Sequence, residues 1–231
     1  MAQEEQKQFW DNEGGDFWAV YAEKLDLFFE PISEAILEMA GISPEDHVLD
    51  IGCGPGTLTL SAMRQAKSAT GVDLSSRLIS LAEEKARTLE LPVTFIASDA
   101  ATYTPTLAPT IILSRFGGMF FDQPVEAFST FRFEGNQKTK LVFASWAPII
   151  LNPWIMETLE VVKPLLLEPL PTPELDKPGP FSLSEPDHIK AILTQAGWEN
   201  ISINLWEKEM GQPVNSPSEA AEFLGHISPA C

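Results

Sequence analysis

The spacing of hydrophobic positions divides the chain into parts with different periods. Residues 8–40 carry apolar side chains at steps of three and four, which predicts an N-terminal helical region. A polar and glycine-rich interruption at residues 11–15 indicates two helical pieces. From residue 47 onward, short apolar runs alternate with segments of helical period. This alternation predicts an α/β fold in which a parallel, doubly wound sheet carries helices on both faces.

The order of elements in the alternating part follows directly. The predicted strands are residues 47–51, 69–73, 92–97, 110–114 and 141–146. Three helices are predicted between them. The first covers residues 57–66, the second begins at the possible N-caps Ser75 and Ser76 and ends near residue 88, and the third covers residues 124–133.

After residue 148 the pattern changes again. A helix is expected at residues 153–163, and seven prolines between residues 164 and 186 then exclude regular structure. We expect this proline-rich stretch to cross the surface as an insertion. A helix at 186–196, an alternating strand at 201–206 and a short helix at 217–224 follow it.

Length and composition favour a single domain and narrow the choice of partners. A chain of 231 residues buries about 70% of its unfolded surface, which suffices for one core. The net charge of −18 repels phosphate backbones and anionic lipids, so we expect neither a nucleic-acid nor a membrane partner. The first residues lack a signal-peptide pattern, and no apolar run approaches the roughly 20 residues of a membrane span. Two cysteines form neither a disulfide framework nor a metal cluster, so we expect a cytoplasmic protein without bound metal.

The most informative segment is residues 48–57, which read VLDIGCGPGT. An apolar run ends in an acid, glycines then alternate with other residues, and a helical pattern begins. Glycines in such a turn let the backbone approach a ligand closely. Dinucleotide-binding turns use G-x-G-x-x-G to hold a pyrophosphate, whereas here the third glycine comes one position early.

This D-x-G-x-G-x-G pattern resembles the first motif of class I S-adenosylmethionine-dependent methyltransferases. The resemblance implies S-adenosylmethionine as cofactor and S-adenosylhomocysteine as product. It implies that Asp50 holds the methionine end, that Asp73 accepts from the ribose hydroxyls and that Asp99 accepts from the adenine amino group. The implied cofactor-binding residues are Asp50, Gly52, Cys53, Gly54, Gly56, Asp73, Leu74, Ser98, Asp99, Ala100 and Ser114.

Residues 114–124, SRFGGMFFDQP, narrow the resemblance to the broad group related to the ubiquinone and menaquinone methyltransferases, and in particular to its small-molecule members. This implies a helical lid at residues 1–40, a cofactor-binding core at 41–147, an insertion or substrate cap at 148–186, and a C-terminal helix and strand at 187–231. The implied reaction is an in-line transfer of a methyl group to nitrogen, oxygen or carbon of a hydrophobic or aromatic metabolite.

Candidates for contact with the acceptor come from the aromatic and titratable residues of these segments. Aromatic side chains expected around an acceptor pocket are Trp10, Trp18, Tyr21, Phe116, Trp146 and Trp154, with core packing as the alternative for each. Candidates for catalysis are Tyr21, Arg115 and His188. For Arg115 a structural salt bridge is the alternative, and for His188 a surface position.

Two departures from the family pattern and two other functions remain open. Residues 133–137 replace the Pro-Gly-Gly turn that relatives carry before the fifth strand, and the family's last strand would have to follow residue 226. A missing strand would leave an open sheet edge, so a monomer and a homodimer are both expected possibilities. The alternative functions are a non-catalytic interaction protein with this fold and an NAD(P)-dependent oxidoreductase.

Overall fold

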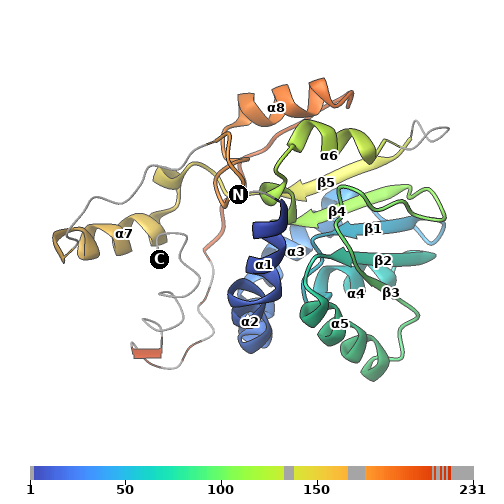
Figure 1. Cartoon of the computed structure of the whole chain (residues 1–231), viewed down its shortest axis with the longest axis horizontal. Coiled ribbons are helices and arrows are strands. Elements are labelled where there is room, and N and C mark those ends of the chain that lie inside the picture. The colour runs from blue at the N-terminus through green and yellow to red at the C-terminus, as the bar shows by residue number, and fades with distance from the viewer. Residues whose placement is uncertain are drawn as a thin grey trace.

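The computed structural model of the protein describes residues 3–132, 138–165, 175–209, 211, 214, 216 and 218–219. Its centre is a five-stranded parallel sheet with the order β3-β2-β1-β4-β5 (Figure 1). The strands are β1 (His47–Ile51), β2 (Ser68–Asp73), β3 (Thr94–Ala97), β4 (Ile111–Arg115) and β5 (Lys140–Ala144). The order reverses between β1 and β4, and ligands bind at the carboxyl ends of strands at such a reversal. The predicted α/β fold with a parallel sheet is therefore confirmed.

Helices cover both faces of this sheet. Helix α4 (Thr57–Met63) follows β1, and α5 (Ser76–Thr88) follows β2; both lie on one face of the sheet. Helices α6 (Pro124–Thr130) and α8 (Pro186–Gln195) lie on the opposite face (Figure 1). Because both faces are covered, the central strands are buried: every residue of β4 is buried, and so are the last four of β1.

The N-terminal region forms three helices where the sequence predicted two pieces. They are α1 (Gln3–Asp11), α2 (Glu13–Val20) and α3 (Ala22–Ala40). The expected break occurs at Asn12, and a second break occurs at Tyr21, which ends α2 and begins α3. The apolar face of α3 packs against β4 and β5, which anchors the region to the sheet.

The proline-rich insertion is more deeply seated than the sequence predicted. It follows η2 (Ile149–Leu151), α7 (Pro153–Val162) and η3 (Lys163–Leu165), and α7 extends away from the sheet (Figure 1). Residues 175–185 form turns without a helix or strand, as expected. However, residues 181–184 are buried, and the Ser182 hydroxyl donates to the carbonyl of Met119 in η1 (Gly117–Phe120) at 2.6 Å. The prediction of a surface crossing is therefore wrong for this part, because apolar Phe181 and Leu183 find room in the core.

The predicted strand at residues 201–206 is also wrong. In the described part of the chain the sheet ends at β5, and residues 201–206 form no strand. Ile203, Leu205 and Trp206 are exposed, so the alternating pattern has no surface against which to bury its apolar face. Three features of the sequence lie outside the described residues: residues 133–137, which replace the Pro-Gly-Gly turn, most of the helix expected at 217–224, and the position after residue 226.

Among the described ranges, no helix combines the length and the apolar composition that crossing a membrane requires.

Candidate active site

The turn after β1 is built around glycines that no other residue could replace without strain. Gly52 has a φ of +64°, and a Cβ at this position would lie 2.7 Å from the Cα of Gly117. The backbone N–H groups of Gly52 and Cys53 donate to the carbonyl of Val72 at 2.8 and 3.1 Å. The turn is therefore fixed between the end of β2 and the start of η1.

Gly54 differs from Gly52 because the space beside it is open. Its φ is +54°, and a Cβ built there would have no neighbouring atom within 4 Å. Its backbone N–H donates to Oδ2 of Asp73 at 2.8 Å. The absence of a side chain at Gly54 thus leaves room for a ligand against the turn.

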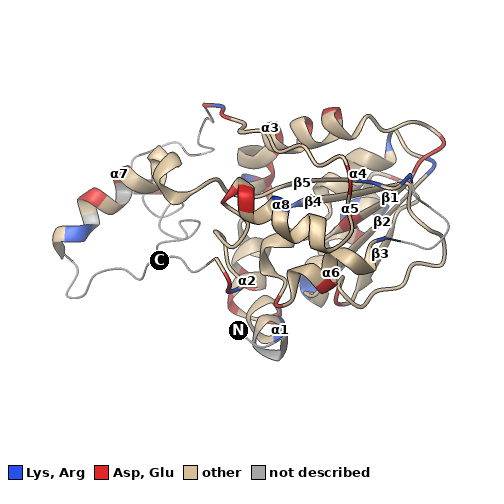
Figure 2. Ribbon diagram, turned by 90° about the horizontal axis from the view of Figure 1, so that it is seen from above, with Lys and Arg blue, Asp and Glu red and all other residues tan. Residues whose placement is uncertain are grey.

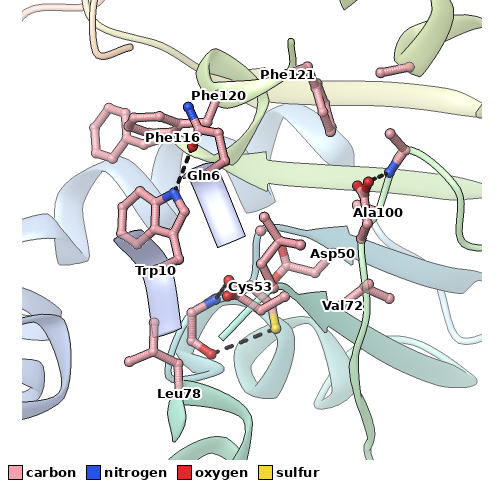
Figure 3. Close-up of a pocket in the computed structure, with 18 of the residues that line it drawn as sticks. Gln6, Trp10, Asp50, Cys53, Val72, Leu78, Ala100, Phe116, Phe120 and Phe121 are labelled. Atoms are coloured by element: carbon pink, nitrogen blue, oxygen red, sulfur yellow. Dashed lines mark hydrogen bonds between the residues drawn. The ribbon is translucent and has the colours of Figure 1, made fainter. Parts of the chain in front are cut away.

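A cavity of about 440 Å³ lies over this turn. It is lined by the carboxyl ends of β1, β2 and β4, by the residues after β3, by η1, by α6 and by the N-terminal helices α1 and α2. Figure 3 shows Trp10 of α1, Asp50 of β1 and Phe120 of η1 around it. The lining combines apolar side chains with carboxylates, a composition that suits a small ligand with a few fixed polar contacts.

Asp50 is the most perturbed acid of the cavity. Its side chain is fully buried, and its Oδ2 accepts a hydrogen bond from the Thr59 hydroxyl at 2.6 Å. Burial raises the pKa of Asp50 to about 7, although Thr59 and the charge of Arg115 act in the opposite direction. Among the described residues, its Oδ1 has no hydrogen-bond partner. A cationic or hydrogen-bonding ligand in the cavity could satisfy this atom.

The other two predicted acids are Asp73, the last residue of β2, and Asp99, which follows β3. Asp73 accepts backbone N–H bonds from Gly54 at Oδ2 and from Ser75 at Oδ1, the latter at 2.9 Å. Burial raises the pKa of Asp73, and these two hydrogen bonds oppose the shift. Asp99 accepts from the backbone N–H of Ala101 at 2.8 Å. Each carboxylate oxygen has a second lone pair, so both acids keep acceptor capacity toward the cavity that they line.

Arg115, at the end of β4, lines the cavity and is also part of an ion pair. One guanidinium nitrogen donates to the Ser33 hydroxyl at 2.8 Å, and the other lies 3.9 Å from a carboxylate oxygen of Asp26. Asp26 in turn accepts from Lys85 at 2.6 Å. Burial lowers the pKa of Arg115, and the charges of Asp26 and Asp50 oppose this shift. Arg115 therefore forms the salt bridge that was the alternative to a ligand contact, and its side chain also lines the cavity.

Most of the residues expected to bind a ligand line this one cavity. They are Trp10, Trp18, Asp50, Gly52, Cys53, Gly54, Asp73, Leu74, Asp99, Ala100, Arg115 and Phe116.

The remaining candidates lie outside the lining. Those candidates are Tyr21, Gly56, Ser98, Ser114, Trp146, Trp154 and His188. The Ser114 hydroxyl is engaged within the fold, because it donates to the carbonyl of Ile51 at 2.8 Å and accepts from the Gly118 N–H at 3.2 Å. Trp146 stacks on Phe116 with ring centroids 4.7 Å apart, and Trp154 contacts Trp146 with centroids 5.6 Å apart. These two tryptophans therefore support the cavity wall from behind it.

Several lining residues were not expected from the sequence. They include Gln6, Phe120, Phe121, Gln123, Glu126 and Thr130. Gln6 could have been found from its spacing, because it precedes Trp10 by four residues and shares its helix face. The residues of α6 carry no comparable signal, since they reach the cavity only through the packing of that helix.

The lining fits the cofactor that the sequence motif implied. Gly54 leaves open space, Asp50 presents an unpaired acceptor, Asp73 ends β2 and Asp99 follows β3. Within the described residues, no group of three or more histidine, cysteine, aspartate or glutamate side chains has the arrangement of a metal site.

Comparison with known proteins points to the same family. A family model described as "Methyltransferase domain" matches residues 48–131. A ribosomal RNA small subunit methyltransferase A from Corynebacterium efficiens is 29% identical over 140 residues, which are 58% of this chain and 44% of that protein. The chain therefore spans less than half the length of this curated relative.

Solved structures resemble the fold over a larger share of the chain. Magnesium protoporphyrin IX methyltransferase from Synechocystis PCC 6803, with bound S-adenosylhomocysteine, has a TM-score of 0.61 and 17% identity, covering 83% of this chain and 87% of that one. The YcgJ protein from Bacillus subtilis has a TM-score of 0.58 and 17% identity, covering 84% and 82%. Residues 48–131 thus match the methyltransferase domain family, and the chain has the fold of the class I methyltransferases that its glycine motif resembled.

Proposed function

We propose that the protein transfers a methyl group from S-adenosylmethionine to a small molecule. The observation that carries this proposal is the position of three carboxylates, Asp50, Asp73 and Asp99, at the ends of adjacent strands around the open side of Gly54. A single cavity thus offers acceptors for the amino, ribose hydroxyl and adenine amino groups of that cofactor.

The cofactor would be held by residues that the structure already orients. Asp73 is fixed by two backbone N–H groups and would accept from the ribose, while Asp99 would accept from the adenine. When bound, the cofactor supplies an activated methyl group, so the protein mainly has to position the acceptor and exclude water. Tyr21 and His188 stay predictions as general bases, and a neutral amine acceptor would need neither.

Charge favours a small-molecule acceptor over RNA. The curated relative is named for action on ribosomal RNA and the Synechocystis protein for action on a porphyrin, so the comparisons leave both classes open. The chain, however, has a net charge of −18, with acidic residues on α3, α6 and α7 among other elements (Figure 2). Exposed Asp122 and Glu126 add negative charge at the cavity. An RNA backbone would be repelled there, because proteins gain RNA affinity by placing basic side chains at phosphates.

The aromatic side of the cavity supports a hydrophobic or aromatic acceptor. Trp10, Trp18, Phe116, Phe120 and Phe121 all line it. Aromatic rings offer large apolar contact area, which a planar or apolar metabolite can cover.

The proposal is tested in two stages. Calorimetry should show binding of S-adenosylmethionine and S-adenosylhomocysteine and no binding of NAD⁺ or NADP⁺; absence of binding for both sulfur compounds would remove the proposal. The protein is then incubated with S-adenosylmethionine and a metabolite extract, and mass spectrometry should find a product heavier by one methyl group. A single-stranded RNA oligonucleotide should show no retention at physiological salt, and strong retention would favour the RNA alternative.

A cytoplasmic location and a monomeric or homodimeric state belong to the same proposal. Sedimentation of the purified protein measures the oligomeric state directly.

A further inference from the structure

Gln6 on α1 presents a buried amide group to the cavity. Its side chain is 3% exposed and lines the cavity together with Trp10, one helical turn later. Its Oε1 accepts a hydrogen bond from the indole N–H of Trp10 at 3.2 Å. Among the described residues, its Nε2 has no hydrogen-bond partner.

The direction of this amide is determined by its neighbour. An indole nitrogen can only donate, so the atom of Gln6 that faces Trp10 must be the oxygen. The NH₂ group then points the other way and cannot exchange places with the oxygen without breaking that bond. A buried NH₂ without a partner is unfavourable, so a group in the cavity that accepts its hydrogen would be bound selectively.

The surroundings of Gln6 are aromatic. The ring of Trp10 meets the ring of Phe120 edge-on, with centroids 5.1 Å apart, and Phe116 lies on the same side of the cavity (Figure 3). The acids expected to hold the ribose and adenine, Asp73 and Asp99, come from β2 and β3 instead. The NH₂ group of Gln6 is therefore a hydrogen-bond donor surrounded by aromatic rings. It lies on the side of the cavity where the proposed function expects the methyl-acceptor substrate.

Building on the proposed function, we propose that the Gln6 side-chain NH₂ donates a hydrogen bond to an oxygen of the acceptor substrate. The substrate class is a neutral, ring-containing molecule with a carbonyl oxygen. The rings of Trp10, Phe116 and Phe120 contact the apolar part, and the amide selects the oxygen. A carboxylate in place of the carbonyl is disfavoured, because five acids and one arginine line the cavity.

The carboxylate of the cofactor's methionine end is the other oxygen that this donor could meet. Binding of two ligands distinguishes the cofactor carboxylate from the oxygen of the acceptor substrate, because 5′-methylthioadenosine lacks the methionine end that S-adenosylhomocysteine carries. If Gln6 serves the acceptor, its replacement leaves the affinity of both ligands unchanged.

The test uses a pair of neutral probes that differ mainly in the carbonyl, 4-hydroxyacetophenone and 4-ethylphenol. Calorimetry measures their binding to the full chain with and without saturating S-adenosylhomocysteine. The wild type should bind the carbonyl probe about fivefold more tightly, which corresponds to one hydrogen bond. Gln6→Glu has the same shape and can still accept from Trp10, but it offers no donor when ionised, so the preference should vanish.

The matched control is Gln8→Glu, which makes the same charge change at an exposed position of α1 and should keep the preference. A second variant, Gln6→Met, removes the donor without adding charge and should also lose it.

Each contrary result has a defined meaning. Equal affinity of the two probes for the wild type, no binding of either probe, or a preference that survives in Gln6→Glu and Gln6→Met would overturn the inference. Loss of S-adenosylhomocysteine affinity in both variants, with 5′-methylthioadenosine unaffected, would assign the amide to the cofactor and overturn it equally. Failure of the wild type to bind S-adenosylhomocysteine would instead contradict the proposed function, while the probe measurement without cofactor still tests Gln6.

Discussion

Replacement of Asp50 by asparagine should make the stability of the protein less sensitive to pH. In the folded chain the pKa of Asp50 is raised from 3.8 to about 7, chiefly by burial. Between these two values the folded state holds a proton that the unfolded state has released. Stability therefore falls as the pH rises through this window, and it stays reduced above pH 7.

The size of the effect follows from the shift. A difference of about 3 pH units at about 1.36 kcal/mol each gives a cost of about 4 kcal/mol for the ionised form above pH 7. At pH 5 the cost is only about 1.6 kcal/mol by the same relation. An asparagine has no such cost, and its carbonyl oxygen can still accept from Thr59. The NH₂ group of the asparagine, however, takes the place of the unpaired Oδ1, and this buried donor without a partner lowers the stability by about 1–3 kcal/mol.

The two contributions together predict a change with pH. Asp50→Asn should be more stable than the wild type by about 1–3 kcal/mol at pH 8 and close to equal or slightly less stable at pH 5. Urea unfolding of the ligand-free protein, followed by tryptophan fluorescence at pH 5, 6, 7 and 8, measures this difference. Other titrating groups are common to both proteins and cancel when the two curves are subtracted.

A matched control is available at the other end of β1. The pKa of Asp46 is lowered from 3.8, chiefly by the hydrogen bond from the Ser43 hydroxyl, so Asp46 stays ionised throughout pH 5–8. Asp46→Asn should lower stability by an amount that does not vary over this range. If the difference between the wild type and Asp50→Asn is equally constant, Asp50 is ionised at no unusual cost and the reasoning fails.

Further predictions concern the turn, the cofactor contacts and the ion pair. Asp73→Ala should weaken S-adenosylhomocysteine binding by about 1–3 kcal/mol, and unchanged affinity in calorimetry would refute the ribose assignment. Gly54→Ala should weaken the same binding and cost only about 1 kcal/mol of stability, because its Cβ meets open space at a positive φ. Gly52→Ala should unfold at a much lower urea concentration, since its Cβ would lie 2.7 Å from the Cα of Gly117. Equal stability of the Gly52→Ala and Gly54→Ala variants would contradict this contrast. Asp26→Asn should destabilise the protein by about 3 kcal/mol because Arg115 and Lys85 would both lose the carboxylate that they share, whereas a loss below about 1 kcal/mol in urea unfolding would show that these ion pairs are unimportant.

The parts of the fold that the sequence predicted well depend on local chemistry. Val48, Leu49 and Ile51 are apolar because β1 is covered on both faces, and the glycines that follow β1 adopt backbone conformations that other residues avoid. The acids at the ends of β1, β2 and β3 could be placed for the same reason, since a parallel sheet brings its carboxyl ends to one edge.

The errors occurred where the outcome depends on a distant partner. Residues 201–206 alternate like a strand, yet an alternating segment becomes a strand only beside another strand, and the described chain ends its sheet at β5. In the opposite sense, Phe181 and Leu183 sit among prolines that suggested an exposed loop, and they are buried because the core has space for them. Neither result is encoded in the residues next to these segments.

Gln6 and Arg115 show the same dependence within the site. A glutamine in an acidic, polar helix indicates a solvated position, and only the indole of Trp10 and the cavity beside it reveal a fixed donor. For Arg115, sequence reasoning left a salt bridge and a ligand contact as alternatives. The structure shows why these do not exclude each other, because Asp26 and Ser33 of α3 hold the guanidinium where it also lines the cavity. The packing of α3 against β4 and β5 therefore orients a cavity residue, so damage to that packing should affect ligand binding as well as stability.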